Sequence, residues 1–327
     1  PPITPSTGAW VIRDSPSIVD IDDYLSILSR PALEEAEFVL VSPGFDILTA
    51  THMHTPSADL PEPKRGGTYA PEYFAPLFAA EDRHFWFRGR NPLIARLVQR
   101  LASAFGPGYR VLEAGCGTGS VLRALEQACA DGNVFGMDLF HEGLRYAQMR
   151  VDCGLVQGDI HHPPFAVGFQ VIGLFDVLEH LPDDGRVLRD LRAMLAPGGA
   201  LVLTVPASKA LWSYFDEVSH HVRRYEQREL RQRLEENGFR VEYLGPYMMS
   251  IYPLVWLNRK LASRLKARGG QQDADQRSDA LSEQELSIVP GVNEILAWVL
   301  GIEARLVYAG RRLPFGTSLI AVGRRVD

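Results

Sequence analysis

From residue 110 onwards, short apolar runs alternate with segments in which apolar residues recur every three or four positions. The runs are RVLEA at 110–114, NVFGMD at 133–138, GLVQGD at 154–159, FQVIGLFD at 169–176 and ALVLTVP at 200–206. Continuous apolar runs of this kind are typical of strands buried on both faces. The periodic segments predict helices over 119–130, 142–150, 183–196 and 226–237. This alternation predicts βαβ units and a parallel sheet covered by helices on both faces.

Two segments precede that alternation. Residues 1–65 are rich in Pro, Ser, Thr and Asp, and their apolar runs FVLVSP and DILTATHMH could be strands. Residues 70–106 predict one or two helices with aromatic residues in the middle. His52 and His54 could bind a metal, but no further ligand stands nearby in the sequence. A solvated loop or edge strand is therefore the preferred interpretation for this pair.

Composition excludes several classes of function. The 327 residues carry a net charge of -6, which does not suggest a protein that binds nucleic acid in general. Three cysteines without CxxC spacing argue against a disulfide framework or zinc knuckle and favour a cytoplasmic location. The longest nearly apolar stretch, around 247–257, is too short to span a bilayer. No secretory signal is recognisable, although a leader removed before Pro1 stays an open alternative.

Three glycines alternate in VLEAGCGTGS, directly after the first of these strands. Ligands of parallel sheets bind at the carboxyl ends of strands, and glycine lets the main chain turn sharply and approach a ligand closely. The dinucleotide fingerprint G-x-G-x-x-G fails because its third glycine would fall on Ser120. The phosphate loop fails because no G-K-[ST] follows. The pattern E-x-G-x-G-x-G, starting at Glu113, therefore favours a nucleoside without phosphates.

Two acids end the following two strands. Asp138 closes VFGMD, where a carboxylate can accept hydrogen bonds from both ribose hydroxyls. Asp159 closes QGD, where it can accept from an adenine amino group. Either acid alone could be a solvated strand end or a helix cap. Their order at the ends of successive strands favours a nucleoside site.

The motifs VLEAGCGTG, VFGMD, QGDI, FDVLEHLPD and LAPGGALVLTVP together resemble class I S-adenosylmethionine-dependent methyltransferases over about residues 83–245. The resemblance implies an α/β fold with a Rossmann-like seven-stranded sheet, mostly parallel with an antiparallel last strand. It also implies S-adenosylmethionine as the cofactor. The residues expected to bind it are Arg90, Glu113, Gly115, Gly117, Gly119, Asp138, Leu139, Asp159, Ile160, Phe175 and Asp176.

Within that set, the resemblance implies separate roles. The glycines line the cofactor, and Asp138 holds the ribose. Asp159 and Ile160 flank the adenine, while Phe175 and Asp176 lie beside the methionine part. The guanidinium of Arg90, or else that of Arg88, could pair with the cofactor carboxylate, because guanidinium binds carboxylate in a bidentate manner.

The resemblance also divides the chain. The expected segments are an N-terminal extension of unknown role at 1–65, a cofactor-binding core with lid helices at 66–245, a helical insertion at 246–316 and the last strand at 317–327. Strand six, FRVEYLG at 239–245, and the last strand, TSLIAVGRR at 317–325, flank this insertion.

The insertion contains LVWLNRKLASRLKAR, in which Leu257, Leu261 and Leu265 recur every four residues and basic residues crowd the rest. A helix packed on the core with a solvated basic face is the preferred interpretation. A peripheral membrane contact, a cover for an anionic substrate and an interface between subunits stay open. The segment GGQQDADQRSD is typical of a flexible connector, and an apolar helix pair is expected near 291–309.

Two further segments resemble narrower groups of these enzymes. HFWFRGRNPLI at 84–94 resembles an N-terminal lid. FDEVSHHVRRYEQREL at 215–230 resembles a D-x-x-x-x-H-x-R-R-Y element of small-molecule methyltransferases, some related to ubiquinone-pathway O-methyltransferases. Trp86, Tyr214 and Tyr225 could form the walls of the acceptor pocket, although aromatic residues at these spacings are as often core.

Methyl transfer from a sulfonium is an in-line displacement, and an oxygen or nitrogen acceptor must also lose a proton. Histidine suits the role of general base near neutral pH. His180 and either His220 or His221 are the candidates, and His221 is preferred because its spacing from Asp216 matches the resembling element. A turn would have to bring Asp216 to His221, where the carboxylate could orient the imidazole. Alternatively, Glu179, His180, Asp216 and His221 could together bind a divalent metal.

These features predict methyl transfer to a small-molecule acceptor, at oxygen, in a natural-product intermediate, a sugar or a lipid-linked precursor. A catalytically idle cofactor-binding or scaffold protein is the rival from another class. A metal-assisted O-methyltransferase is a further alternative. A nicotinamide-dependent oxidoreductase is disfavoured by Ser120. The oligomeric state is left open.

Overall fold

The computed structural model describes residues 73–165, 168–266 and 287–326, with no side chains described for 261–266. Of the segment before residue 73 it describes three strand backbones: β1 (Trp10–Arg13), β2 (Phe38–Val41) and β3 (Leu48–Thr49). The pair His52 and His54 and the connector GGQQDADQRSD lie outside the described residues.

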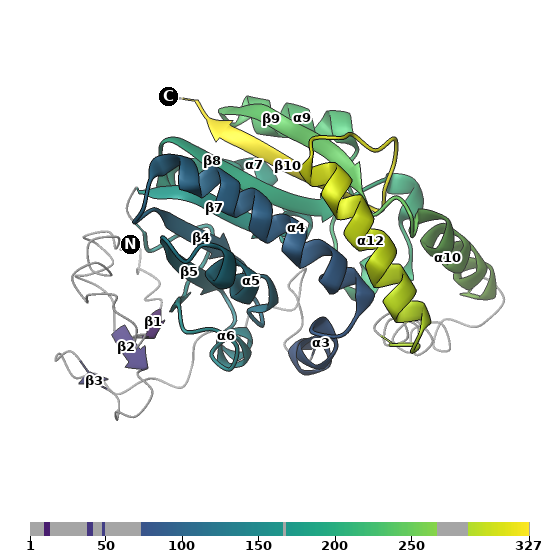
Figure 1. Ribbon diagram of the computed structural model, residues 1–327, viewed down its shortest axis with the longest axis horizontal. Helices are drawn as coiled ribbons and strands as arrows, with labels where there is room; N and C mark the ends of the chain where they lie inside the picture. Colours follow the sequence, from purple (N-terminus) through teal and green to yellow (C-terminus); the bar gives the residue numbers. More distant parts are fainter. Residues whose placement is uncertain are drawn as a thin grey trace, which may run out of the picture.

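A mixed sheet forms the centre of the fold (Figure 1). Its core strands are β4 (Arg110–Ala114), β5 (Asn133–Asp138), β6 (Gly154–Gln157), β7 (Phe169–Phe175), β8 (Leu195–Pro206), β9 (Phe239–Tyr247) and β10 (Ser318–Arg325). Their spatial order is β6-β5-β4-β7-β8-β10-β9. β10 is antiparallel to both β8 and β9, and the other neighbouring pairs are parallel. The predicted seven-stranded sheet with an antiparallel last strand is therefore confirmed.

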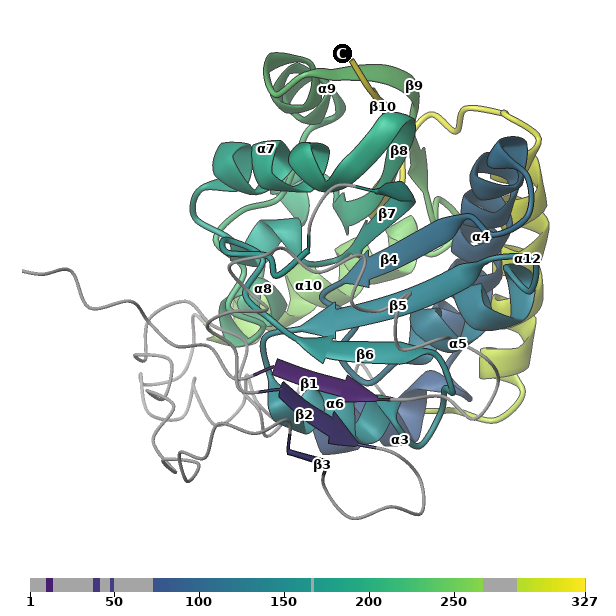
Figure 2. The same cartoon turned by 90° about the vertical axis from the view of Figure 1, so that its left-hand side faces the viewer.

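The three N-terminal strands extend this sheet beyond β6 (Figure 2). β1 meets β6 in an antiparallel arrangement at Ile12 and Val156, β2 runs parallel to β1, and β3 runs antiparallel to β2. The apolar run FVLV is β2, and Leu48 and Thr49 of the run DILTATHMH form β3. The sheet thus has ten strands among the described residues.

Helices cover both faces of the sheet. They are α3 (Phe74–Glu81), α4 (Phe85–Ala102), α5 (Ser120–Ala128), α6 (His141–Ala147), α7 (Asp184–Met194), α8 (Tyr214–Val218), α9 (Gln227–Glu236), α10 (Tyr252–Lys266) and α12 (Val292–Tyr308). Figure 2 shows α4, α5 and α12 on one face and α7 and α9 on the other. Alternate residues of the strands feed two apolar cores: Leu112 and Leu203 face one core, and Val111 and Val202 face the other.

The predicted boundary between the helix over 183–196 and the strand after it was wrong. The helix expected over 183–196 ends at Met194, and β8 begins at Leu195, so that Pro197, Gly198 and Gly199 lie inside the strand. The pairing of β7 with β8 shifts register between Phe169 and Val171, which accommodates this irregular start. The Pro-Gly-Gly signal therefore marks a distorted strand entry rather than the last turn of the helix.

The insertion between β9 and β10 contains α10 and α12. α12 packs on α4, as Figure 1 shows, and is a single helix where a helix pair was expected. The leucine stripe of α10 does not pack on the core at its first position, because Leu257 is 51% exposed. Arg259, expected on a solvated face, is instead buried and donates to the carbonyl oxygen of Leu211 at 2.6 Å. The preferred interpretation of this helix was therefore wrong at both residues.

Gly89 and Gly301 offer a test of the packing of α12 on α4. An alanine Cβ at Gly89 would lie 2.7 Å from Leu300 Cβ, whereas one at Gly301 would meet no atom of the other described segments within 4 Å. Alanine gains about 1 kcal/mol of helix propensity over glycine, so Gly301→Ala should raise the free energy of unfolding by up to that amount. Gly89→Ala should lower it by about 1–2 kcal/mol, because the overlap forces the two helices apart. Urea denaturation measures both changes, and shifts of the same sign would contradict this packing.

Candidate functional site

The glycine-rich turn after β4 has a left-handed backbone conformation at each of its three glycines. Gly115, Gly117 and Gly119 have φ values of 75°, 50° and 77°, which strain any side-chain-bearing residue. A Cβ on Gly115 would lie 2.5 Å from Val177 Cγ2, and one on Gly119 would lie 3.0 Å from Ala147 Cα. A Cβ on Gly117 would have, among the described residues other than its chain neighbours, just a Phe74 ring carbon within 4 Å, at 3.9 Å. Gly115 and Gly119 therefore permit close chain packing, while Gly117 leaves space at the strand ends.

Two buried carboxylates border this turn. Asp138 accepts from the amides of Gly117 at 2.7 Å and Phe140 at 2.8 Å. Burial raises its pKa, and these amides oppose the rise. Glu113 is buried, its Oε2 has no hydrogen-bond partner among the described residues, and burial raises its pKa well above the usual range. Carboxylates with remaining acceptor capacity beside a side-chain-free turn fit a ligand that carries hydroxyl and amino donors.

The other residues expected around a nucleoside lie at the same edge of the sheet. Asp159 follows β6 and accepts from the amide of His161 at 2.8 Å. Ile160 is partly buried against the core, Leu139 is 43% exposed and Phe175 is buried at the end of β7. Contact of these residues with adenine or methionine stays a prediction.

Arg90 of α4 and Asp176, which follows β7, are brought together as an ion pair. The Arg90 side chain is almost fully buried, and its guanidinium lies 4.3 Å from the centre of the Trp86 ring. Arg88, the alternative partner for a cofactor carboxylate, faces the surface and pairs with Glu294 of α12 at 2.6 Å. Of the two arginines, only Arg90 therefore lies at the carboxyl ends of the strands.

His221 is held by Asp216 at the start of the segment after α8. Its Nδ1 lies 2.9 Å from Asp216 Oδ1, and its backbone amide donates to the Asp216 carbonyl oxygen at 2.8 Å. His220, with a φ of 55°, supplies the tight turn between them. The turn that the sequence required is therefore present. The ring of His180 lies edge-on to His221, with centroids 4.8 Å apart.

Asp216 is the centre of a larger polar cluster. It has no exposed surface, accepts from Arg224 Nε at 2.6 Å and lies 3.6 Å from an Arg259 nitrogen. Burial raises its pKa, but the hydrogen bond from His221 and the charges of both arginines outweigh burial, so the pKa lies below its usual value. Asp216 therefore stays ionised and fixes the orientation of the His221 ring.

Glu179 and His180 complete the cluster on the opposite side of His221. Glu179 Oε1 lies 4.0 Å from His221 Nε2, and neither carboxylate oxygen of Glu179 has a hydrogen-bond partner among the described residues. Burial, together with nearby Asp176, raises the pKa of Glu179 well above the usual range. Burial and His221 lower the pKa of His180 to about 3, so that its ring is neutral. Ligand atoms of Glu179, His180 and His221 lie within 4.8 Å of one another, a spacing that could hold a metal ion.

The aromatic residues proposed as pocket walls divide into two groups. Trp86 lies against Arg90, and Tyr214 is buried at the start of α8. Tyr225 has no exposed surface, and its hydroxyl donates to Asp184 at 3.0 Å within the core. Its placement as a pocket wall is therefore wrong: Tyr225 anchors the chain to α7.

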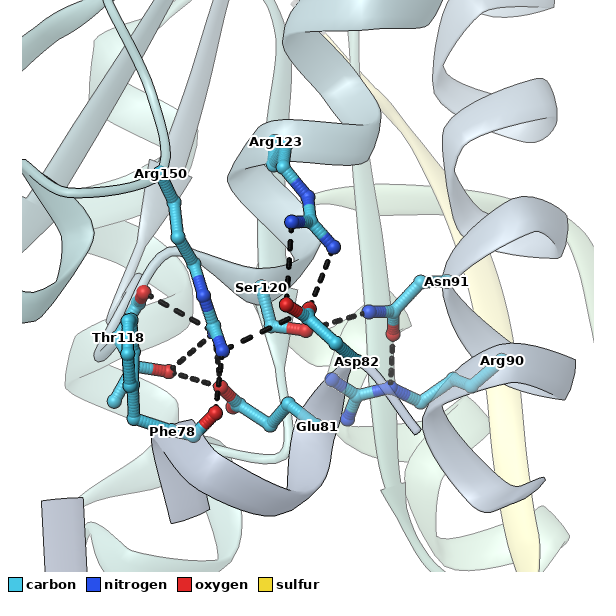
Figure 3. Close-up of polar contacts among 9 residues, drawn as sticks. All are labelled: Phe78, Glu81, Asp82, Arg90, Asn91, Thr118, Ser120, Arg123 and Arg150. Atoms are coloured by element: carbon cyan, nitrogen blue, oxygen red, sulfur yellow. Dashed lines mark hydrogen bonds and ion pairs between the residues drawn. The ribbon is translucent and has the colours of Figure 1, made fainter. Parts of the chain in front are cut away.

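Sequence reasoning missed the polar network that joins α3 to the glycine-rich turn (Figure 3). Arg150 forms a buried ion pair with Glu81 and donates to the Phe78 carbonyl oxygen at 2.7 Å. Glu81 also accepts from the Thr118 hydroxyl at 2.5 Å. Burial raises the Glu81 pKa, and Thr118 and Arg150 oppose the rise. The only signal in the sequence was the clustering of charges in AAEDRH.

Comparison with known proteins assigns the core of this chain to a protein family. The family model described as a methyltransferase domain matches residues 86–244. Residues 86–244 form a class I S-adenosylmethionine-dependent methyltransferase domain. This confirms the family resemblance, and S-adenosylmethionine is the cofactor of the domain. The open glycine turn, with Glu113 and Asp138 beside it, fits that cofactor.

Two curated relatives cover parts of this methyltransferase domain. The ubiquinone biosynthesis O-methyltransferase of Bordetella avium is 34% identical over 116 residues, 33% of this chain and 47% of that protein. A Mycolicibacterium smegmatis protein named as an S-adenosylmethionine-dependent methyltransferase is 29% identical over 168 residues, 49% of this chain and 62% of that protein. The chain thus spans about half the length of the curated relatives it matches.

A solved structure supports the fold of this chain. It is the complex between the Haloferax volcanii Trm112 methyltransferase activator and a methyltransferase. The match has a TM-score of 0.50 and 17% identity, and covers 78% of this chain and 95% of that one. At this identity the likeness concerns the fold.

The Glu81–Arg150 pair makes a prediction for stability. Arg150→Leu should lower the free energy of unfolding by about 3–5 kcal/mol, because it leaves a carboxylate buried without its cation. Adding Glu81→Met should recover most of this loss, since both charges are then gone. Arg123→Leu, which breaks the more exposed pair with Asp82, is the control and should cost at most about 1 kcal/mol. Urea denaturation of the four proteins would contradict the pair if the double variant were no more stable than Arg150→Leu.

Proposed function

We propose that this protein transfers a methyl group from S-adenosylmethionine to an oxygen of a small-molecule acceptor, with His221 as general base. The observation that carries the proposal is the Asp216–His221 pair, with Nδ1 and Oδ1 2.9 Å apart. Other enzymes abstract protons with a histidine of which one ring nitrogen is held by a carboxylate and the other takes the proton. The partial likeness to a ubiquinone biosynthesis O-methyltransferase supports oxygen as the methylated atom.

The base lies close to the expected cofactor site. β7 ends at Phe175, and the residues after it lie close to both the glycine-rich turn and His221. Val177 is the side chain that a Cβ on Gly115 would meet, and Glu179 lies 4.0 Å from His221 Nε2. The backbone amide of Val222 also donates to the Glu179 carbonyl oxygen at 2.9 Å. A short segment thus connects the glycine turn to the imidazole.

The chemistry divides between positioning and proton removal. Bound S-adenosylmethionine supplies an electrophilic methyl group and leaves as a neutral thioether. Alignment of the acceptor oxygen can contribute about 7–11 kcal/mol in well-oriented systems. His221 Nε2 would take the acceptor proton, and ionised Asp216 would stabilise the resulting imidazolium through Nδ1. Arg90 would bind the carboxylate of the cofactor, and Trp86 would line the acceptor pocket.

A metal-assisted O-methyltransferase is the second candidate, favoured by the cluster of Glu179, His180 and His221. Glu179 offers two oxygens without hydrogen-bond partners, and Asp216 orients His221 as carboxylates orient metal-bound imidazoles. A divalent ion there would polarise the acceptor oxygen, and His221 would then be a ligand rather than a base. Turnover after treatment with a chelator distinguishes the two mechanisms. A loss of turnover that Mg²⁺ or Mn²⁺ reverses favours the metal-assisted mechanism, and unchanged turnover favours His221 as general base.

Asp138 tests the cofactor site. Asp138→Ala should weaken the binding of S-adenosylmethionine by about 1–3 kcal/mol, because a buried hydrogen-bond acceptor for the ribose is lost. Asp131→Ala, an exposed acid just before β5 at the opposite end of the strand, is the matched control and should bind normally. Isothermal calorimetry measures both affinities. Unchanged affinity in Asp138→Ala would remove this residue from the cofactor site.

His221 tests the chemical step. His221→Gln should lower turnover by about 10²–10⁴-fold, the contribution of a positioned base, while leaving the affinity for S-adenosylmethionine unchanged. Transfer of a labelled methyl group to components of a cell extract measures turnover without knowledge of the acceptor. Turnover equal to that of the native protein would exclude His221 as base. An absence of labelled product with the native protein, despite tight cofactor binding, would favour the idle cofactor-binding alternative.

A further inference from the structure

Helix α12 is apolar on two opposite sides. Its inner side packs on α4 through buried Ala297, Leu300 and Val307. Asn293 accepts from the Phe85 amide at 2.8 Å and so ties the start of α12 to the start of α4. Its outer side exposes Val292, Ile295, Trp298, Ile302 and Leu306, with exposed fractions of 52%, 63%, 68%, 39% and 46%.

These five residues form one stripe, because each follows the previous one by three or four positions. We call them the outer stripe. A helix that is hydrophobic all round is normally buried inside a protein or a membrane. Contiguous exposed apolar surface of this kind marks an interaction site. Since Trp298 is the most exposed of the five, the stripe offers an aromatic side chain of the type enriched at membrane interfaces.

The charges around the outer stripe are mainly positive. Arg305 lies in the last turn of α12, and Arg311 and Arg312 follow it, all exposed. Over 287–316 the exposed acid is Glu294, which pairs with Arg88 at 2.6 Å, and the other acid, Glu303, is buried. This positive surface contrasts with the net charge of -6 of the whole chain.

We propose that the outer stripe and its arginines dock on an anionic lipid bilayer. An interfacial helix lies in the membrane plane, with apolar side chains among the acyl chains and basic residues at anionic headgroups. Within the described residues no helix is long and apolar enough to cross a membrane. In the proposed arrangement α12 lies in the plane of the bilayer surface. Its inner side stays on α4, so docking requires no unfolding.

The charge pattern favours a bilayer over a second copy of this chain. An interface between two copies would have to pair Arg305, Arg311 and Arg312 with acids of the same surface. The exposed acid there, Glu294, already has Arg88 as its partner. Anionic headgroups supply the missing negative charge.

Flotation of the full chain with vesicles tests this proposal. The protein should float with vesicles of phosphatidylglycerol and phosphatidylcholine in equal parts, and much less with phosphatidylcholine alone. Each basic residue near an anionic surface contributes about 1 kcal/mol, so Arg311→Glu with Arg312→Glu should lower the partition coefficient by roughly 25-fold or more. Trp298→Ser with Ile302→Ser should lower it by about tenfold or more, because apolar side chains no longer insert.

Matched controls separate this surface from general effects. Phe105→Ser removes a ring that is 40% exposed after α4, and Arg228→Glu with Arg231→Glu reverses two charges on α9, on the other face of the sheet. Both controls should float as the native protein does. All variants should keep their affinity for S-adenosylmethionine, which reports that they fold and does not depend on the acceptor.

Three results would overturn the proposal. The native protein could fail to float with anionic vesicles, or the α12 variants could float as well as the controls. Sedimentation could also show a dimer that Trp298→Ser with Ile302→Ser converts to a monomer, without any binding to vesicles. That last result would assign the outer stripe to a second copy of the chain.

Discussion

The buried carboxylate of Asp216 is the shared partner of the polar groups around His221. It draws together the start of α8, His221, Arg224 and, from the insertion, Arg259. A carboxylate without exposed surface is tolerated only when it is paired and hydrogen-bonded. The two arginines therefore secure the charge that orients the imidazole. Loss of either would weaken both the packing of the segment after α8 and the position of the base.

The sequence predicted the sheet well because apolar runs and glycines act locally. RVLEA, NVFGMD and FQVIGLF became β4, β5 and β7 at almost the predicted bounds. The pairing of Asp216 with His221 was also predictable, since they lie five positions apart and only a turn was required. Pro197 to Gly199 misled because Pro-Gly-Gly breaks a helix and can equally distort the start of a strand.

Long-range polar contacts could not be predicted in the same way. The leucines of α10 suggested which side faces the core, but Arg259 is buried 3.6 Å from Asp216 whereas Leu257 is exposed. The Glu81–Arg150 pair joins residues 69 positions apart. Neither residue carries a local pattern that names its partner. The periodicity of apolar residues indicates which apolar surface is buried. Leaving one buried charge unpaired costs more free energy than burying several methylene groups gains, so a charged pair can decide which side of a helix faces the core.

The same contacts tie the insertion to the site. Arg259 connects α10 to Asp216, and its guanidinium also lies 5.4 Å from the centre of the Phe215 ring. Glu303 of α12 is buried and accepts from the amides of Met249 and Ser250 at 2.8 and 3.0 Å, just before α10 begins. Both helices are thus held by buried charges rather than by apolar contact alone. Arg259 of the insertion and His221 therefore contact the same carboxylate, with Arg259 3.6 Å from Asp216 Oδ2 and His221 Nδ1 2.9 Å from Asp216 Oδ1.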